Sequence, residues 1–309
     1  MLQFAAKPYR SEYGAISSCL HRLQRSSKVG YRWDQVALIG IGLLGGSIGL
    51  ALRRSQLARH IVGMGRNPDR LAQALQAGVI TQVAETVESA VAEAEIVVVA
   101  TPVNSVPDLV RTCALAAKKT HLLTDVGSTK SEIVDQLSDL PTDVPFVGSH
   151  PLAGSEQSGF EFAREDLLDD KIVFVTPTDN TDTQVVENAH TFWESIGARV
   201  HELSAETHDR LMAHTSHLPH LIASALAGSA SIDHPDFYGR GFRDTTRLAS
   251  GNVEMWVPIL LQNREFLLQA VQNFQSTLGE WEQALSQCDS TNLKRLLIEG
   301  KKHRDSLGS

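Results

Sequence analysis

After a polar N-terminal stretch, the chain carries short apolar runs that alternate with segments of helical periodicity. The apolar, β-like runs lie at residues 36–39, 60–64, 95–100, 121–126, 146–149, 172–176 and 199–203. Helices are predicted between them, up to about residue 56 and over residues 68–76, 129–137 and 183–196. Short buried strands that alternate with helices are typical of a parallel sheet covered on both faces. The pattern therefore predicts an α/β fold with an N-terminal doubly wound sheet of the Rossmann type.

Beyond residue 203 the β-like runs stop, and helical periodicity continues to the end of the chain. Between residues 260 and 281 apolar side chains recur every seven positions with others beside them: Leu260, Leu267, Phe274 and Trp281, together with Leu261, Leu268, Val271 and Leu278. This predicts a long helix with a wide apolar face that has to be buried. Packing within the chain and a two-fold subunit interface are the alternative ways to bury it. We predict a dinucleotide-binding domain over residues 34–203, followed by an all-helical domain over residues 204–309 that binds substrate and forms a homodimer.

Residues 1–33 differ in composition from the rest of the chain. They contain six Lys or Arg residues, one acidic residue and several serines. A transit peptide has this composition, and an unordered N-terminal extension is compatible with it as well. We expect a flexible extension, with the transit peptide as the alternative.

Composition limits the classes of function. The 309 residues carry a formal net charge of −8 without a basic domain or stripe, which argues against a nucleic-acid partner. Cys19, Cys113 and Cys288 are odd in number and widely spaced, so we predict neither a disulfide framework nor a zinc pattern. We expect a cytoplasmic protein with a small-molecule partner and no membrane partner.

The first apolar run leads into a glycine-rich turn. A short membrane span is the alternative for residues 36–52, but this uncharged stretch has five glycines and falls short of the ~20 residues that cross a bilayer. The GxGxxG spacing brings backbone N–H groups to a dinucleotide pyrophosphate at a helix N-terminus. The predicted cofactor site comprises the residues of this turn and the two that follow the run at 95–100: Gly40, Ile41, Gly42, Leu43, Leu44 and Gly45, with Thr101 and Pro102.

The residue after the second strand distinguishes NAD from NADP. NAD-binding sites usually place Asp or Glu there to accept from the ribose 2′-hydroxyl. This chain has Gly65 followed by Arg66 and Asn67, and a guanidinium can pair bidentately with a 2′-phosphate. We therefore add Arg66 and Asn67 to the predicted cofactor site and favour NADP over NAD. A stacking role for Arg66, which would leave NAD usable, is the alternative.

His150 is the candidate for a catalytic base. It follows a predicted strand at its C-terminal end, where open α/β sheets place their ligands. An imidazole there can take a proton from a substrate hydroxyl near neutral pH, as hydride transfer from a carbinol carbon requires. On position alone, a structural histidine is the alternative.

Four further histidines, His208, His214, His217 and His220, lie close together in the sequence. The last three are spaced by threes, but Pro219 interrupts their helix, and no HExxH motif or cysteine partner accompanies them. We predict no metal site, with one or two of these histidines facing substrate and the others hydrogen-bonded.

Four segments, taken together and in order, resemble the prephenate/arogenate dehydrogenase family. They are GIGLLGGSIG at 40–49, DVGSTK at 125–130, GSHPLAGSE at 148–156 and HDRLMAHTSHLPH at 208–220. The resemblance covers about residues 35–285. It implies an NAD(P)-dependent oxidoreductase of tyrosine biosynthesis that converts prephenate to 4-hydroxyphenylpyruvate and CO2 by oxidative decarboxylation. Arogenate is the alternative substrate.

The resemblance also implies roles for individual residues. His150 would accept the proton of the ring C4 hydroxyl, Ser128 would orient His150, and Arg247 would hold a substrate carboxylate, for which a planar guanidinium is suited. Asp244 lies one helical turn before Arg247 and is predicted to hold its guanidinium. The remaining predicted substrate-binding residues are Glu156, Ser216, His220 and Trp256.

Two other classes of protein share a dinucleotide-binding sheet followed by helices. A β-hydroxyacid or imine reductase is one, with Lys130 as the residue that suggests it, although the segment at 148–154 has no role there. A non-catalytic NADP-binding protein is the other, because fold alone does not establish activity.

Overall fold

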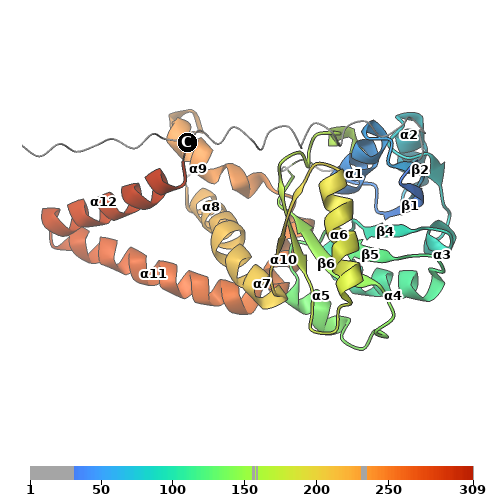
Figure 1. Cartoon of the computed structure of the whole chain (residues 1–309). Helices are drawn as coiled ribbons and strands as arrows, with labels where there is room; N and C mark the ends of the chain where they lie inside the picture. The colour runs from blue at the N-terminus through green and yellow to red at the C-terminus, as the bar shows by residue number, and fades with distance from the viewer. Residues whose placement is uncertain (1–30, 155–156, 158, 231–234, 309) are drawn as a thin grey trace, which may run out of the picture. The chain divides into compact units, whose positions relative to one another are not determined.

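The structure is a computed structural model that describes residues 31–154, 157, 159–230 and 235–308. The described chain forms an eight-stranded sheet followed by helices (Figure 1). The strands lie side by side in the order β3-β2-β1-β4-β5-β6-β7-β8. Their bounds are β1 Trp33–Ile39, β2 Ala58–Met64, β3 Gln82–Val83, β4 Ile96–Val99, β5 Leu122–Asp125, β6 Phe146–Pro151, β7 Ile172–Thr176 and β8 Arg199–Glu202. The predicted fold class is confirmed, and only the two-residue β3 was not predicted.

The sheet is parallel from β3 to β6, and β7 runs antiparallel to β6. This pairing extends β6 beyond its predicted end, because His150 pairs with Phe174 and Pro151 with Val173. The prediction that His150 follows the strand is therefore wrong. His150 lies within β6, so the sheet itself holds its backbone.

Helices cover both faces of the sheet. The first face is covered by α1 (Leu43–Arg54) and α6 (Thr183–Ser195), and the second by α3 (Val87–Val91), α4 (Val106–Ala116) and α5 (Ser131–Gln136). The nine-residue helix α2 (Pro68–Gln76) has its predicted bounds. The helices α3 and α4 were not predicted. Covered faces explain why β4 and the last four residues of β1 are apolar at every position, since each residue faces one of two cores.

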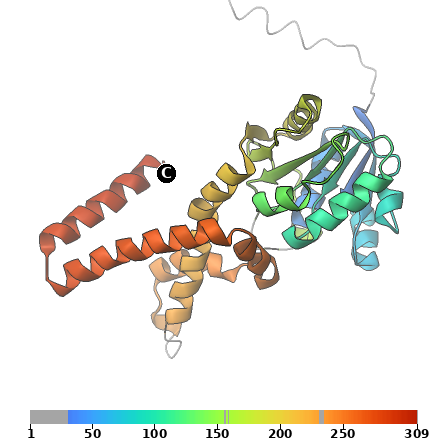
Figure 2. The same ribbon diagram turned by 90° about the horizontal axis from the view of Figure 1, so that it is seen from below.

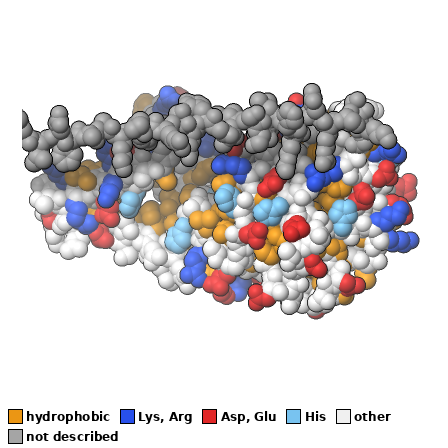
Figure 3. Space-filling view, in the orientation of Figure 1, with side chains coloured by type: hydrophobic (Ala, Val, Ile, Leu, Met, Phe, Trp, Pro, Cys, Tyr) orange, Lys and Arg blue, Asp and Glu red, His pale blue; other side chains and the backbone are white. Residues whose placement is uncertain are grey.

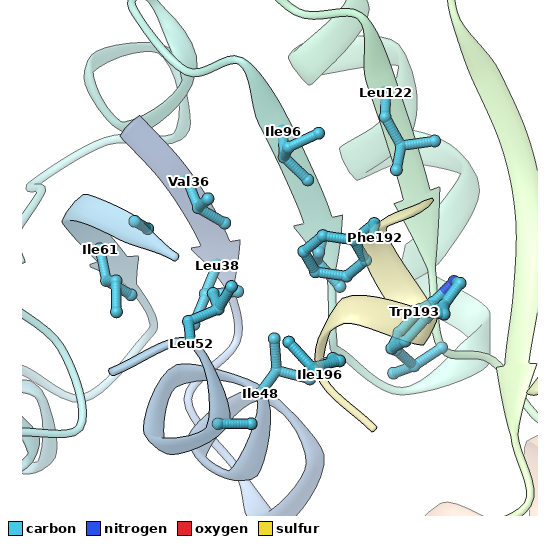
Figure 4. Packing of buried hydrophobic residues seen from close by; sticks show 14 of the residues in the cluster. Val36, Leu38, Ile48, Leu52, Ile61, Ile96, Leu122, Phe192, Trp193 and Ile196 are labelled. Atoms are coloured by element: carbon cyan, nitrogen blue, oxygen red, sulfur yellow. The ribbon is translucent and has the colours of Figure 1, made fainter. Parts of the chain in front are cut away.

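Successive residues of β1 alternate between these cores. Leu38 packs with Ile48 of α1 and Phe192 of α6, whereas Ile39 belongs to the cluster on the other face (Figure 4). Trp33, which was predicted to belong to the N-terminal extension, is buried at the start of β1 with its ring 5.6 Å from Phe192. The ordered sheet thus begins slightly earlier than predicted.

The helical region, which we define as residues 205–308, begins just after β8. Its helices are α7 (Ala205–Met212), α8 (Leu218–Ser229), α9 (Arg240–Thr246), α10 (Val253–Gln262), α11 (Arg264–Ser286) and α12 (Ser290–Ser306). A five-residue π-helix, Ala213–His217, joins α7 to α8. Pro219 does not interrupt α8, because it lies in the first turn of this helix, where a backbone N–H has no partner within the helix. Figures 1 and 2 show α12 turning back from the end of α11.

The single long helix predicted around residues 260–281 is instead two helices that meet at Asn263. Asn263 leaves helical geometry with φ −102° and ψ 23°, and its buried side chain is hydrogen-bonded to other segments. Sequence periodicity does not detect this break because the apolar spacing continues across it.

Only part of the apolar face of this segment is buried within the chain. Leu267 and Ala270 pack with Leu218 of α8 in a small core. Leu261 and Leu268 are instead 60% and 58% exposed. One side of the stripe is thus covered within the chain and the other is uncovered in the single chain.

Charge is mixed on the surface seen in Figure 3, where acidic and basic side chains alternate among apolar side chains and histidines. This face presents no continuous basic stripe of the kind that tracks a nucleic-acid backbone. Among the described helices, none is long and apolar enough to cross a membrane.

The core of the first face allows a direct test. Phe192 is fully buried and contacts both Trp33 and Trp193. We expect Phe192→Ala to lower the free energy of unfolding by roughly 3–5 kcal/mol in urea titrations, through lost burial and a cavity. Leu115→Ala is the control. Because Leu115 is 90% exposed, this substitution should change the free energy of unfolding by less than about 0.5 kcal/mol. Equal effects of the two substitutions would contradict this description of the core.

Candidate functional site

The glycine turn between β1 and α1 has the geometry of a phosphate cradle. Gly40 has φ +104°, and a Cβ there would lie 2.3 Å from the carbonyl oxygen of Ala100. A Cβ on Gly45 would lie 2.0 Å from the carbonyl oxygen of Gly40. These two glycines therefore make the tight turn and the close helix packing. A Cβ on Gly42 would meet nothing within 4 Å, so only an incoming group would need that space.

The start of α1 is suited to an anion. Gly42 is its N-cap, and no side chain of the described residues caps this terminus or places an acid in its first turn. Backbone N–H groups and the positive end of the helix dipole are left for a phosphate. Thr101 is next to the turn, since its Cγ2 would lie 2.9 Å from a Cβ on Gly40. The residues present thus fit the pyrophosphate of a dinucleotide.

The segment after β2 combines an exposed cation with a helix cap. Arg66 is exposed, and Asn67 is the N-cap of α2, where its Oδ1 accepts from the N–H of Arg70 at 3.1 Å. The side chain of Asn67 is therefore engaged in capping, which differs from a direct cofactor role. A Cβ on Gly65 would meet only Leu71, at 3.5 Å, so a side chain fits at this position.

A buried chain of hydrogen bonds starts at His150. Its Nδ1 lies 2.8 Å from Nε2 of His208, and Nδ1 of His208 lies 2.7 Å from Oδ1 of Asp209. His150 comes from β6, whereas His208 and Asp209 come from α7. The ring of His208 also packs edge-on against Phe174 of β7, with centroids 5.7 Å apart. The imidazole of His150 is therefore held by a partner from the helical region.

Asp209 is bonded from several directions. Its Oδ1 and Oδ2 accept from the backbone N–H groups of Lys130 and Ser131, both at 2.8 Å, at the start of α5. Its backbone carbonyl accepts from Nδ2 of Asn263 at 2.8 Å, and the same Nδ2 lies 2.9 Å from Nδ1 of His217. One buried aspartate thus joins the sheet region to α7 and to the junction of α10 and α11.

A second buried pair supports the backbone of β6. The ammonium of Lys130 binds the carboxylate of Asp125 and donates to the carbonyl of Ser149 at 2.8 Å. Asp125 also accepts from the N–H of Ser149 at 3.1 Å and from that of Gly127 at 2.8 Å. Both side chains are fully buried, so Lys130 has a structural role beside His150.

Burial determines the protonation of the histidines. Burial, and then the neighbouring His208 and Lys130, lower the pKa of His150 well below its usual value of 6.5. Burial also lowers the pKa of His208, although Asp209 acts in the opposite direction. Burial acts to raise the pKa of Asp209, but hydrogen bonds from His208 and from backbone N–H groups outweigh it and lower this pKa. At neutral pH the site therefore contains neutral imidazoles and an ionised aspartate.

His150 borders a cavity of about 760 Å³ between the sheet region and the helical region. Five of the predicted site residues line it: His150, Ser216, His220, Arg247 and Trp256. His220 and Trp256 stack with ring centroids 3.7 Å apart and 13° between their planes, which forms one wall. Arg164 and Lys171 add two more cations to the lining. A cavity with one buried base and several cations suits a small anionic molecule with a reactive hydroxyl.

Two predicted residues are placed differently. Ser128 is half-buried after β5, and among the described contacts no hydrogen bond joins it to His150, whose ring is oriented by His208 instead. Asp244 forms an i,i+4 ion pair with Arg240 at 3.4 Å on α9, because the chain changes to a 3₁₀ turn at Arg247 and carries that residue off the helix. The described contacts therefore pair Asp244 with Arg240, and the prediction that it holds Arg247 stays untested. Glu156 lies outside the described residues.

Sequence reasoning missed the partners of His150. Asp209 and Lys130 were present in the motifs at 208–220 and 125–130, but only the fold brings them to β6. The adjacent His208 and Asp209 were the available signal, since a buried carboxylate beside a histidine commonly orients its ring.

The other histidines separate by environment. His214 is exposed and His217 is buried against Asn263. Within the described residues, no three His, Cys, Asp or Glu side chains are grouped so that they could hold a metal ion.

The buried His217 makes stability depend on pH. Burial lowers its pKa from 6.5 to about 4, so below pH 6.5 the unfolded chain takes up a proton that the folded chain does not. Stability should fall as the pH decreases from about 6.5 to 4, by at most about 3 kcal/mol from this residue. His217→Asn should reduce this pH dependence in urea titrations, whereas His214→Asn should not. A stability difference between wild type and His217→Asn that stays constant with pH would contradict the assignment.

Comparison with known proteins agrees with this geometry. The family model described as "Prephenate dehydrogenase, nucleotide-binding domain" matches residues 48–202, and the one described as "Prephenate dehydrogenase, dimerization domain" matches residues 204–299. Prephenate dehydrogenase of Bacillus subtilis is 35% identical over 282 residues, which are 89% of this chain and 76% of that protein. Cyclohexadienyl dehydrogenase of Zymomonas mobilis is 33% identical over 285 residues, which are 89% of this chain and 96% of that protein.

A solved structure extends the likeness to three dimensions. Prephenate dehydrogenase of Aquifex aeolicus, in complex with hydroxyphenyl propionate and NAD+, is 30% identical with a TM-score of 0.82. The match covers 89% of this chain and 98% of that one. The chain therefore belongs to the prephenate dehydrogenase family, and its sheet and helices correspond to that family's nucleotide-binding and dimerization domains.

Proposed function

We propose that the protein is a prephenate dehydrogenase, which oxidises and decarboxylates prephenate to 4-hydroxyphenylpyruvate with NAD(P)+ in tyrosine biosynthesis. The observation that carries this proposal is the neutral, buried His150 at the edge of a cation-lined cavity that Arg247 also borders. Family membership supports it, as does the aromatic ligand bound with NAD+ in the Aquifex aeolicus relative. Arogenate, or both substrates, is the alternative, because one relative is a cyclohexadienyl dehydrogenase.

The cofactor belongs at the glycine turn. Gly42 and the N-terminus of α1 would hold the pyrophosphate, with Ile41, Leu43 and Leu44 in the same turn. Thr101 and Pro102 follow β4 beside it. The nicotinamide ring supplies the hydride acceptor when it is bound. The protein supplies alignment, because a carbon and its acceptor react fast only when they are held in contact.

The substrate carries two carboxylates, and the cavity offers cations for both. Arg247 suits one of them because a planar guanidinium binds both carboxylate oxygens. His220, stacked on Trp256, is placed to contact the side chain of the substrate, and Ser216 adds a hydroxyl to the same wall. The ring hydroxyl then belongs at His150, the buried base of the cavity.

His150 handles the proton of the C4 hydroxyl. Because burial keeps its pKa well below 6.5, its imidazole is neutral and can accept a hydrogen bond at neutral pH. Loss of CO2 makes the ring aromatic, which favours decarboxylation without further help from the protein. The phenolic oxygen of the product needs a proton, and His150 can return the one it accepted.

NADP is the cofactor that we favour. Arg66 is exposed directly after β2, where NAD-specific sites usually carry an acid, and Asn67 supports the backbone there as a helix cap. A 2′-phosphate within reach of Arg66 would gain a charge-assisted bond.

We also propose a homodimer in the cytoplasm. The matched dimerization domain and the exposed Leu261, Leu268 and Leu285 support a second copy as the cover of this surface. The mass of a single chain in sedimentation at micromolar concentration would contradict the dimer. The free thiols of Cys113 and Cys288 are in keeping with a reducing compartment.

Substrate oxidation tests the proposed function. We expect reduced nicotinamide to form when prephenate and NADP+ are mixed with the protein, at a higher kcat/KM than with arogenate. The same assay with each cofactor separates the alternatives. No reduction with either substrate would leave a reductase or a non-catalytic NADP-binding protein, and Lys130, bound to Asp125, already argues against the reductase.

Two substitutions separate the roles in the cavity. His150→Asn should lower kcat by about 10²–10⁴-fold and leave cofactor affinity near normal, because a base is lost. Arg247→Ala should mainly raise the KM for prephenate, because a carboxylate partner is lost. Steady-state kinetics and dinucleotide titration measure both. Unchanged turnover in His150→Asn would rule out its role as the base.

Cofactor preference depends on Arg66 in this account. Arg66→Ala should raise the KM for NADP+ by about tenfold or more and change that for NAD+ little. Gly65→Asp should shift preference toward NAD+, since the site has room for the side chain. Arg70→Ala is the matched control, with a nearby exposed cation on α2 removed. Equal effects of Arg66→Ala on both cofactors would contradict the preference.

A further inference from the structure

The hydrogen bonds that link His150 to His208 and His208 to Asp209 determine which ring nitrogen of neutral His150 carries the hydrogen. Asp209 receives two backbone N–H bonds, from Lys130 and Ser131, one on each oxygen, and these bonds favour its ionised form. The 2.7 Å contact between this carboxylate and Nδ1 of His208 then requires that Nδ1 of His208 carries hydrogen. A neutral imidazole has one N–H, so Nε2 of His208 is an acceptor.

The same reasoning continues to His150. Its Nδ1 lies 2.8 Å from the acceptor Nε2 of His208, so Nδ1 of His150 must donate. The hydrogen of neutral His150 is therefore on Nδ1, and the lone pair is on Nε2. We propose that His208 and Asp209 are positioning residues that hold His150 in this tautomer and stabilise its charged form.

This inference rests on the proposed function, for which it adds two residues. As hydride leaves C4 for nicotinamide, the O–H bond of the substrate breaks and the proton joins Nε2 of His150. The positive charge is then shared along the bond to His208 and faces the carboxylate of Asp209. When the bond to CO2 breaks, its electron pair enters the ring, and the phenolate oxygen takes the proton back from Nε2. No net proton is gained or lost.

The surroundings explain why such support is needed. Burial of His150 lowers its pKa, and so does Lys130, a buried cation bound to Asp125, so both oppose a positive charge on His150. Asp209 is the carboxylate that His208 contacts directly, so it offsets these effects where the charge develops. A comparable pairing of a buried aspartate with a catalytic histidine stabilises the imidazolium in hydrolases.

Two substitutions at His208 separate orientation from packing. His208→Phe keeps the ring volume but removes the acceptor, and we expect kcat to fall by about 10²-fold with KM unchanged. His208→Gln places an amide oxygen near the position of Nε2. Its kcat should therefore be at least tenfold higher than that of His208→Phe. His214→Phe, at an exposed position in the neighbouring π-helix, is the control and should keep wild-type kcat. Melting curves and dinucleotide titration report folding.

A direct reading of the tautomer does not depend on turnover. In 15N spectra of histidine-labelled wild-type protein, assigned with His150→Asn, we expect the hydrogen of His150 on Nδ1. In His208→Phe we expect it on Nε2, the form that solvent favours. A hydrogen on Nε2 in wild type, or kcat within twofold of wild type in His208→Phe, would overturn the inference. If wild type fails to oxidise prephenate, the proposed function is wrong, and the spectra still test the positioning. If His208→Phe does not fold, the wild-type spectra and His208→Gln decide.

Discussion

The carboxylate of Asp209 is the contact on which the site depends. It binds two backbone N–H groups at the start of α5 and the ring of His208 in its own helix. The backbone carbonyl of Asp209 accepts from Asn263 between α10 and α11. A buried charge is stable only when its oxygens are bonded, so these segments are held together around it. The position of His150 relative to the helical wall of the cavity follows from this one residue.

The sheet and the helical region each contribute different residues to the site. The sheet provides rigid ends for the glycine turn and for His150, whereas the helical region provides Arg247, His220 and Trp256. The proposed reaction is accelerated by alignment of the substrate and by a well-placed base. Both require side chains that the sheet and the helical region hold in fixed positions. The antiparallel β7 contributes by pairing with β6 through His150, which makes the base part of the sheet.

Periodicity and glycine spacing were sufficient to predict seven of the eight described strands, the glycine turn between β1 and α1, and the helical C-terminal region. They could not predict the break at Asn263 or the π-helix before α8, because tertiary hydrogen bonds decide both. The resemblance led to His150 and Arg247, and the cavity brings these two together. The role expected for Ser128 came from the resemblance, and that for Asp244 came from its place one helical turn before Arg247. In the structure His208 is hydrogen-bonded to His150, and Asp244 pairs with Arg240.

The central claim is that the ring oxygen of the substrate is handled at His150. A crystal structure of the protein with dinucleotide and 4-hydroxyphenylpyruvate tests it most directly. We expect the phenolic oxygen within about 2.6–3.2 Å of Nε2 of His150, with the carboxylate of the ligand on Arg247 and the nicotinamide over the ring carbon. A ligand bound with its phenolic oxygen away from His150 and its carboxylate away from Arg247 would contradict the account.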